Sequence, residues 1–220
     1  MHKEFWIEKW EKNQTGFHQS EINSYLKTYW HQMELKQNAN VLVPLCGKSK
    51  DLLWLNEQKH NVTASEISQI AVVDFFEENN IPFQKKKINA GEEYFHDNLT
   101  MIQGDFFQLS NSEIPSIDAV YDRAAMVALT PEQRFQYSKL LHNILRVGSK
   151  IFLISIEYDQ RKMDGPPFSV DEKEIRSLYE PHFLIKLIHQ FNENVNIGRF
   201  ADKGLKYVSE KVYILQKQAG

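Results

Sequence analysis

Several short apolar runs of the sequence are followed by acidic side chains, which can bind the hydroxyl and amino groups of a nucleoside. Glu66 comes about 20 residues after Gly47, the spacing at which an acid binds ribose hydroxyls in nucleotide-binding α/β folds. Asp105 can accept a hydrogen bond from an adenine amino group, although a helix N-cap is the alternative. Asp122 and Arg123 place an acid beside a base. These residues predict a site for a ligand that carries adenosine.

The elements that must position Glu66 can be read from the residues before it. Residues 41–45 form an apolar, β-branched run that is too short for a helix, and it runs into Cys46-Gly47, which predicts a buried strand and a tight turn. Residues 51–58 have the apolar pattern of a helix packed on a sheet, and residues 62–65 form a second strand that ends at Glu66. The alternative is an ordinary strand-helix-strand unit without a ligand.

Two phosphate-binding motifs are excluded around Gly47. Gly47-Lys48-Ser49 resembles the end of a P-loop, but that motif needs a glycine where this chain has Leu42. The G-x-G-x-x-G pattern that brings a backbone close to a pyrophosphate is not found either. A single Gly47 therefore suits a ligand that has adenosine but no diphosphate.

The rest of the chain alternates predicted helices and strands. Because the carboxyl ends of parallel strands share one edge of a sheet, Glu66, Asp105 and Asp122-Arg123 are expected to converge there. The pattern predicts a single α/β domain over residues 1–220, with a seven-stranded, mostly parallel sheet, helices on both faces and two N-terminal helices within residues 1–40. Further helices are expected over 67–78, from Pro131 to an end at Gly148, and over 171–179. Strands are expected within 95–107 and over 117–123, 151–158, 184–190 and 206–215.

Composition narrows the class of protein. The 220 residues carry a formal net charge of -3, and the pI near 6.2 shows no basic surplus of the kind that nucleic-acid binders have. One cysteine allows no internal disulfide, and no Cys/His cluster has the spacing of a metal site. No apolar run is long enough to span a bilayer. We expect a cytoplasmic monomer that binds a small molecule, and neither nucleic acid, membrane nor metal.

Two further segments suit the walls of a pocket. Trp10 and Phe17 flank a polar, glycine-containing loop that could cover a ligand. The alternative for these aromatic residues is a hydrophobic contact that holds the N-terminal helices on the sheet. Residues 164–170 contain two adjacent prolines, and so rigid a loop suits a pocket wall.

Taken in order, several motifs resemble those of the thiopurine S-methyltransferase family. The resemblance covers nearly the whole chain, and its specificity lies in the combination of the motifs. They are Trp10 with Phe17-His18-Gln19, VPLCGKSKDLLWL from Val43, SEISQIAV from Ser65, YDRAAMVAL from Tyr121, GPPFSV from Gly165 and EKVYIL from Glu210.

The resemblance implies a Rossmann-like, class I methyltransferase fold with S-adenosylmethionine as cofactor and S-adenosylhomocysteine as product. It also implies that residues 1–40 cover the cofactor site and that the methyl group goes to the sulfur of an aromatic or heterocyclic thiol. In bacterial members it implies selenium or tellurium compounds as further acceptors, and so a role in metalloid detoxification. Metalloid, halide or oxygen acceptors remain an alternative on the same fold. A non-catalytic adenosyl-binding module would be expected to lack Glu66, Arg123 or the N-terminal cover.

The same resemblance assigns roles to individual residues. The family's cofactor positions fall on Trp10, Leu45, Glu66 and Arg123, with Gly47 leaving room for the ligand and Asp105 as a further contact. Arg199 matches an arginine near the substrate, where it would favour a thiolate, and Phe17 would contact the acceptor. The alternative for Arg199 is a surface salt bridge. No general base is expected, because an aromatic thiol ionises readily.

Overall fold

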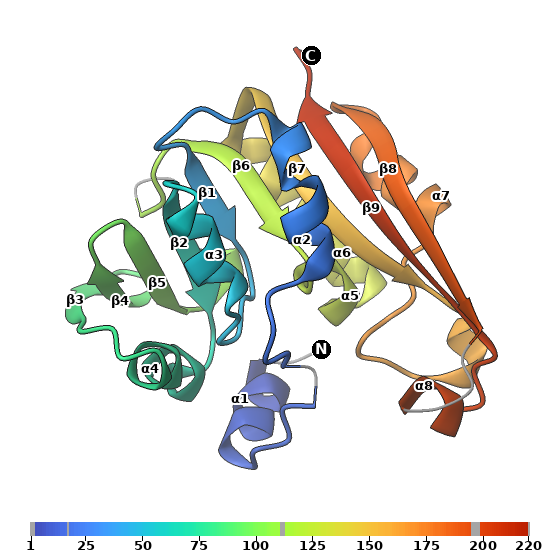
Figure 1. Cartoon of the computed structure of the whole chain (residues 1–220), viewed down its shortest axis with the longest axis horizontal. Helices are drawn as coiled ribbons and strands as arrows, with labels where there is room; N and C mark the ends of the chain where they lie inside the picture. The colour runs from blue at the N-terminus through green and yellow to red at the C-terminus, as the bar shows by residue number, and fades with distance from the viewer. Residues whose placement is uncertain (1–2, 17, 111–112, 195–198, 220) are drawn as a thin grey trace. The chain divides into compact units, whose positions relative to one another are not determined.

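The computed structural model describes residues 3–16, 18–110, 113–194 and 199–219, with Arg199 described by its backbone alone (Figure 1). Its chain divides into two compact units, residues 1–121 and residues 122–220, each with its own strands and helices. The single domain over residues 1–220 stays a prediction. Among the residues described, no helix is both long and apolar enough to cross a membrane.

The first unit is built on strands in the order β3-β4-β5-β2-β1-β6. Strands β5, β2, β1 and β6 run parallel, and β3 and β4 form an antiparallel hairpin beside β5. Val41 and Leu42 of β1 and Ala64 of β2 are fully buried, as in parallel sheets covered on both faces. The strands are β1 (Asn40–Val43), β2 (Asn61–Glu66), β3 (Gln84–Ile88), β4 (Gly91–His96), β5 (Leu99–Gly104) and β6 (Ile117–Asp122).

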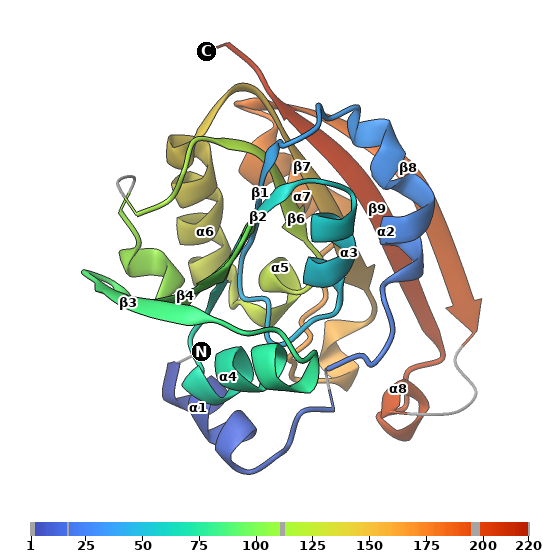
Figure 2. The same ribbon diagram turned by 60° about the vertical axis from the view of Figure 1, so that its left-hand side comes forward.

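Side-chain caps begin two helices of this unit. Asn23 Oδ1 accepts hydrogen bonds from the backbone N–H groups of Tyr25 and Leu26, and Ser68 Oγ accepts one from that of Ala71. Helix α1 packs beside α4 (Figure 2). The helices are α1 (Lys3–Glu11), α2 (Ser24–Tyr29), α3 (Asp51–Glu57) and α4 (Gln69–Glu78), with the 3-10 helices η1 (Trp30–Met33) and η2 (Phe106–Gln108).

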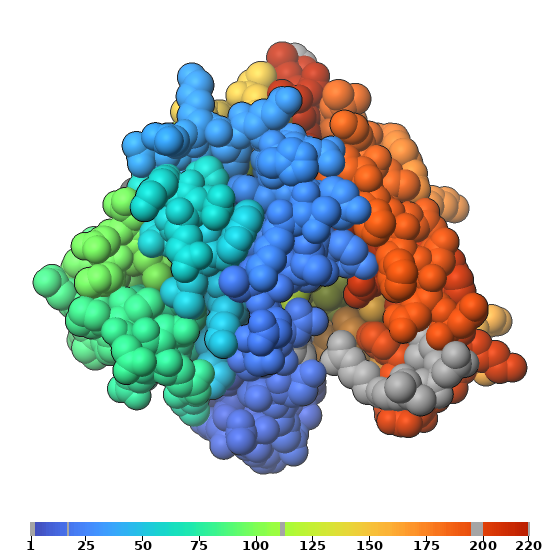
Figure 3. All heavy atoms as spheres, in the orientation of Figure 1, coloured from blue at the N-terminus to red at the C-terminus, as the bar shows by residue number. Residues whose placement is uncertain are grey.

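Asp51 joins the N-terminal helices to the start of α3. Its carboxylate is 1 % exposed and accepts hydrogen bonds from the backbone N–H of Asn23 and from the hydroxyl of Tyr121, both at 2.8 Å. Nearby, Trp30 Nε1 donates to Nε2 of the buried His60 at 3.1 Å. The blue segment with α2 and the cyan segment with α3 accordingly lie against each other in the space-filling view (Figure 3). Buried polar contacts thus fix α2 on the first unit.

The second unit has antiparallel strands in the order β7-β9-β8, and β8 and β9 correspond to the two strands predicted last in the chain. Thr130 and Gln133 form a capping box at the start of α6, and Asp171 caps α7. The strands are β7 (Leu145–Glu157), β8 (Phe183–Asn194) and β9 (Tyr207–Lys217). The helices are α5 (Ala125–Ala128), α6 (Pro131–Ile144), α7 (Glu172–Tyr179) and α8 (Arg199–Asp202), with the 3-10 helix η3 (Gln160–Lys162).

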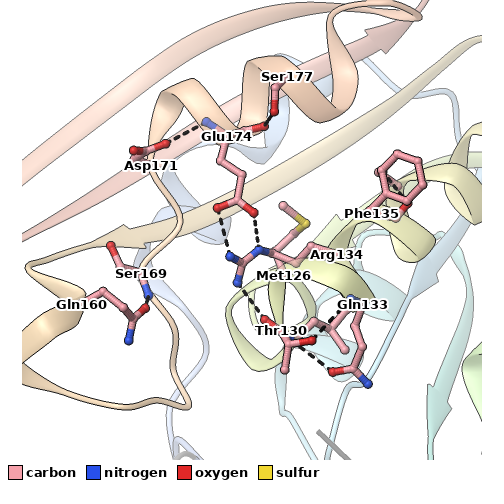
Figure 4. A network of polar contacts seen from close by, with 12 residues as sticks. Met126, Thr130, Gln133, Arg134, Phe135, Gln160, Ser169, Asp171, Glu174 and Ser177 are labelled. Carbon is pink, nitrogen blue, oxygen red and sulfur yellow. Dashed lines mark hydrogen bonds and ion pairs between the residues drawn. The ribbon is translucent and has the colours of Figure 1, made fainter.

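An ion pair between Arg134 and Glu174 connects α6 to α7 (Figure 4). Arg134 is 3 % exposed, and its Nε and Nη2 atoms donate to the two carboxylate oxygens of Glu174 at 2.6 and 3.0 Å. Its Nη1 donates to the carbonyl of Leu129 at 2.7 Å. Each nitrogen of the guanidinium thus donates one hydrogen bond to a protein group, which makes this pair a structural element of the unit.

Two features of the fold differ from the sequence prediction. The described residues hold nine strands rather than seven, because the charged segment of β3 pairs with β4. The helix that begins at Pro131 ends at Ile144, and Gly148 lies inside β7 instead of ending the helix. Lys217 Nζ from β9 donates to the carbonyl groups of His142 and Leu145, each at 2.6 Å, so a distant side chain completes the end of the helix.

Candidate functional site

The turn after β1 has a strained backbone. Leu45 has a φ of +50° and Gly47 a φ of +56°, in the left-handed region that a leucine rarely occupies. The backbone N–H of Leu45 donates to Ser65 Oγ at 3.4 Å, and that of Cys46 donates to the Ser65 carbonyl at 3.0 Å, so β2 holds the turn. Strain of this kind costs about 1–3 kcal/mol and is concentrated at binding and catalytic sites. The turn is therefore a candidate site on geometry alone.

Glu66 closes the other side of the turn. Its Oε2 accepts a hydrogen bond from the N–H of Gly47 at 2.9 Å, and its Oε1 accepts one from the N–H of Ser68 at 2.8 Å. Glu66 is 6 % exposed, and burial raises the pKa of its carboxyl despite these two bonds. Each oxygen of a carboxylate has a further lone pair. The acceptors that remain match the two neighbouring hydroxyls of a ribose.

Trp10 of α1 lies against the same turn. A Cβ atom at position 47 would stand 3.3 Å from Cζ2 of Trp10, a tight contact, and the positive φ favours glycine in any case. Lys48 Nζ lies 5.8 Å from the centre of the Trp10 ring, within the range of a cation–π contact. The structure thus brings Trp10, Gly47 and Glu66 together within the first unit, and the ligand they bind stays a prediction.

Asp105 follows β5, the strand next to β2. Its Oδ1 accepts a hydrogen bond from the N–H of Phe107 at 3.0 Å and so caps η2, which is the alternative that the sequence left open. Gln103 at the end of β5 donates from Nε2 to the carbonyl of Ile67 at 3.0 Å. Asp105 therefore stands at a strand end adjacent to that of Glu66, and its contact with an adenine stays a prediction.

Asp122 and Arg123 open the second unit. Asp122 is 1 % exposed and accepts hydrogen bonds from the N–H groups of Ala125 and Met126 at 3.1 and 3.2 Å. The hydroxyl of Tyr137 donates to its other oxygen at 2.8 Å. Burial raises the pKa of Asp122 to about 6 in spite of these bonds. The bonds fix the backbone turn that carries Arg123, whose cofactor contact stays a prediction.

The two predicted substrate residues are not defined by the structure. Phe17 lies outside the described residues, and Arg199 is described only as the first backbone position of α8. The next residue, Phe200, has its ring centre 6.4 Å from that of Tyr158 and packs on an apolar cluster that contains Leu205. Helix α8 is thereby anchored within the second unit, while the roles of Phe17 and Arg199 stay predictions.

The second unit also contains an open cavity of about 510 Å³. Asp164, Phe168 and Ser169 line it, so the proline-containing loop does form the wall of a pocket. Arg134 and Glu174 line it as well, with their charges already paired. Within the described part of the chain, no group of three or more His, Cys, Asp or Glu side chains is placed to hold a metal ion.

The sequence did not predict a structural role for Lys48, which enters the sequence analysis only through the excluded phosphate-binding motif. Its Nζ lies 3.0 Å from Asp74 Oδ2 and 2.6 Å from Glu78 Oε1. The available signal was the placement of these two acids four residues apart on one helix, which puts them on the same face.

Several solved structures with the same fold are methyltransferases. The 1,6-didemethyltoxoflavin-N1-methyltransferase of Burkholderia thailandensis, solved with S-adenosylhomocysteine, has a TM-score of 0.66 at 14 % identity over 99 % of this chain and 87 % of its own. The magnesium protoporphyrin IX methyltransferase of Synechocystis, solved with S-adenosylmethionine, has a TM-score of 0.62 at 15 % identity over 98 % and 97 %. The fold is that of the class I S-adenosylmethionine-dependent methyltransferases, which confirms the predicted fold class.

The sequence comparisons identify the family. The model of the thiopurine S-methyltransferase family matches residues 1–218. A thiopurine S-methyltransferase of Nitrosospira multiformis is 39 % identical over 98 % of both chains, and one of Vibrio cholerae is 40 % identical over 97 % of both. The chain belongs to the thiopurine S-methyltransferase family, and S-adenosylmethionine is its methyl donor.

Proposed function

We propose that this methyltransferase transfers its methyl group to the sulfur of an aromatic or heterocyclic thiol. The observation that supports the donor half is the buried Glu66 carboxylate, which holds the N–H of Gly47 and keeps acceptor positions for a ribose. The names of the curated relatives support the acceptor half. The same names favour a thiopurine among such thiols.

The residues of the first unit bind the donor in this proposal. Glu66 accepts the ribose hydroxyls, the backbone at Leu45 and Gly47 meets the methionine part, and Asp105 bonds the adenine amino group. Trp10 covers the ligand from α1. Bound S-adenosylmethionine supplies a methyl group on a sulfonium sulfur that leaves as a neutral thioether.

Other residues bind the methyl acceptor and favour its thiolate form in this proposal. Arg199 favours the thiolate by opposite charge, and Phe17 contacts the aromatic ring. Arg123 binds the cofactor, and its charge would add to the effect of Arg199 on the thiolate. Transfer between two sulfur atoms is an in-line displacement, so the protein has to align the groups and exclude water rather than move a proton. The thiol proton leaves to solvent before transfer, because aromatic thiols are acidic enough.

Isothermal titration of the purified protein with S-adenosylhomocysteine tests the donor site, with ATP and NAD as controls. Binding on the order of micromolar Kd for S-adenosylhomocysteine alone is expected. Binding of ATP or NAD with equal affinity would contradict the adenosyl-specific site, since the turn has one glycine and no phosphate motif.

A product assay then tests the acceptor class. The protein is incubated with S-adenosylmethionine and a thiopurine, a simple aromatic thiol, selenite, tellurite or iodide, and methylated products are identified by mass spectrometry. A methylated thiol as the fastest product is expected. Faster methylation of selenium, tellurium or halide would replace the proposed acceptor with the alternative one.

The role of Arg199 is tested in the same assay. Arg199→Ala should leave the affinity for S-adenosylhomocysteine nearly intact and lower turnover of the thiol, with the larger loss at pH values below the thiol pKa. Loss of cofactor binding in this variant would show that Arg199 belongs to the donor site instead.

A further inference from the structure

Lys48 lies where the turn after β1, α4 and the N-terminal helix meet. Its Nζ is bonded to Asp74 and Glu78 of α4 and lies 5.8 Å from the centre of the Trp10 ring. The side chain of Lys48 is 13 % exposed, far less than is usual for a lysine. Burial opposes its charge, but the hydrogen bonds with Glu78 and Asp74 prevail and raise the pKa of its ammonium.

The position of α1 depends on the indole that Lys48 faces. Trp10 is the buried residue of this helix, while the neighbouring apolar side chains Trp6 and Ile7 are only partly covered. The indole lies against Gly47, and the N–H of Gly47 in turn donates to Glu66. A continuous set of contacts therefore connects the acids of α4, through Lys48 and Trp10, to the turn.

The surroundings of Lys48 argue against direct binding of an anionic ligand. Two carboxylates of α4 already neutralise its ammonium, and a lysine that binds phosphate or carboxylate needs donors that are free for the ligand. The same carboxylates hold the ammonium over the Trp10 ring, where a partly buried cation–π contact is favourable. The geometry therefore favours a structural role for Lys48 beside the turn over direct contact with a ligand.

We propose that Lys48 is a positioning residue for the methyl-donor site: held by Asp74 and Glu78, it fixes the indole of Trp10 over the turn at Gly47. The role rests on the proposed function of that turn and deepens it. Lys48 acts through Trp10 and the backbone of Gly47, without touching the cofactor. Loss of its charge releases the indole, and bound cofactor then dissociates faster.

Titrations of three variants test the affinity. Lys48→Met keeps the length of the side chain and removes its charge, and it should weaken binding of S-adenosylhomocysteine about tenfold, mainly through a faster off-rate in stopped-flow measurements. Lys48→Arg keeps the charge and should retain affinity within about threefold. The matched control is Lys50→Met, which makes the same change of charge at an exposed position two residues away.

The comparison of two ligands separates position from charge. S-adenosylmethionine has a sulfonium cation that S-adenosylhomocysteine lacks, so a residue that acts by position should alter both affinities by the same factor. A direct effect of the lysine charge would instead be repulsion of the sulfonium, so Lys48→Met would then favour S-adenosylmethionine over S-adenosylhomocysteine. Unequal factors for the two ligands would therefore overturn the positioning role.

Fluorine NMR reports on the indole without any ligand. The chain has four tryptophans, and in protein labelled with 5-fluorotryptophan the Trp10 resonance is assigned by its loss in Trp10→Phe. Lys48→Met should shift or broaden this resonance and leave the Trp54 resonance in place, which also shows that the variant is folded. The pair Asp74→Asn with Glu78→Gln, which leaves Lys48 but removes its anchors, should move the Trp10 resonance in the same direction.

The outcomes distinguish a failure of the role of Lys48 from a failure of the proposed function. If wild-type protein binds S-adenosylhomocysteine and Lys48→Met binds it equally well, the role of Lys48 is wrong while the proposed function stands. If the wild type does not bind it, both are overturned. A lower melting temperature in Lys48→Met with unchanged affinity and an unmoved Trp10 resonance would make Lys48 merely a stabilising residue.

Discussion

Glu66 and Gly47 are joined by a hydrogen bond of 2.9 Å between a buried carboxylate and a backbone N–H, across 19 residues of sequence. This bond makes the acid at the end of β2 a part of the turn after β1. The acid therefore shapes the turn and, in the proposed function, binds the ligand that the turn receives. Substitutions at either residue are expected to change stability and cofactor affinity together.

Replacing Glu66 with glutamine should weaken S-adenosylhomocysteine binding by about 1–3 kcal/mol. Glutamine has one acceptor oxygen and an NH2 group, so the N–H of either Gly47 or Ser68 would face a donor. Calorimetric titration measures the change, and Glu57→Gln, at an exposed position on α3, is the matched control. Equal affinities of the two variants would remove Glu66 from the site.

Replacing Gly47 with alanine should lower the free energy of unfolding by about 1–3 kcal/mol, since the left-handed backbone alone costs an alanine about 1–2 kcal/mol. The rest comes from the Trp10 ring, 3.3 Å from the new Cβ. Gly204→Ala provides the comparison, because Gly204 has a φ of +76° with no atom within 4 Å of its Cβ position. Urea denaturation should show a smaller loss for Gly204→Ala; an equal loss would mean that the indole yields freely.

The buried carboxyl of Asp122 should make stability fall as the pH rises. Its pKa is raised from 3.8 to about 6, so the folded state binds the proton more tightly than the unfolded state does. The free energy of unfolding should therefore decrease between about pH 4 and pH 6 by roughly 3 kcal/mol from this group, and the loss is complete above pH 6. Tyr137 and Tyr179, which interact with it, have pKa values raised well above this range.

Asp122→Asn isolates this contribution. The amide keeps the size of the side chain and cannot titrate, so the difference in unfolding free energy between wild type and variant should change across pH 4–6 and level off above it. Urea denaturation at half-unit steps of pH measures the difference. Parallel curves for the two proteins would show that Asp122 titrates at its ordinary pKa.

Loss of the guanidinium from α6 should destabilise the second unit. Arg134→Met leaves Glu174 without its partner in a largely buried place, and we expect a loss of about 2–4 kcal/mol, below the fully buried range because Glu174 is 27 % exposed. Arg134→Met combined with Glu174→Leu should recover part of it. Arg161→Met, whose side chain is 89 % exposed, is the control and should leave the free energy of unfolding almost unchanged. A double variant no more stable than Arg134→Met would contradict this explanation.

The local pattern was sufficient to predict the strand, turn and acid of the candidate site. Val41 and Leu42 lie in a buried parallel strand, whose residues are apolar on both faces, and Gly47 and Glu66 stand at its turn and at the end of the next strand. The hairpin of β3 and β4 was not predicted, because β3 is rich in exposed lysines and lacks the alternation of apolar and polar residues that marks a strand.

Long-range side-chain contacts could not be predicted in the same way. The position of the Lys48 side chain depends on hydrogen bonds to Asp74 and Glu78, which lie 26 and 30 residues further along the chain. The end of α6 depends on Lys217, 75 residues beyond the carbonyl of His142 that it bonds. Sequence spacing can put two acids on one helix face, but it does not identify the distant side chain that they bind. Only the packing of the helices on their strands brings such partners together.

The single cysteine of the chain, Cys46, stands in the turn between Leu45 and Gly47, and its Sγ donates to the Gly47 carbonyl at 3.2 Å. Burial and, after it, the charge of Glu66 raise the pKa of this thiol well above its ordinary value. A protonated thiol is a poor nucleophile. In the proposed function this thiol stands next to an alkylating cofactor, and we expect its protonated sulfur to resist methylation. The carboxylate that would prepare the site for its ligand would then also disfavour automethylation.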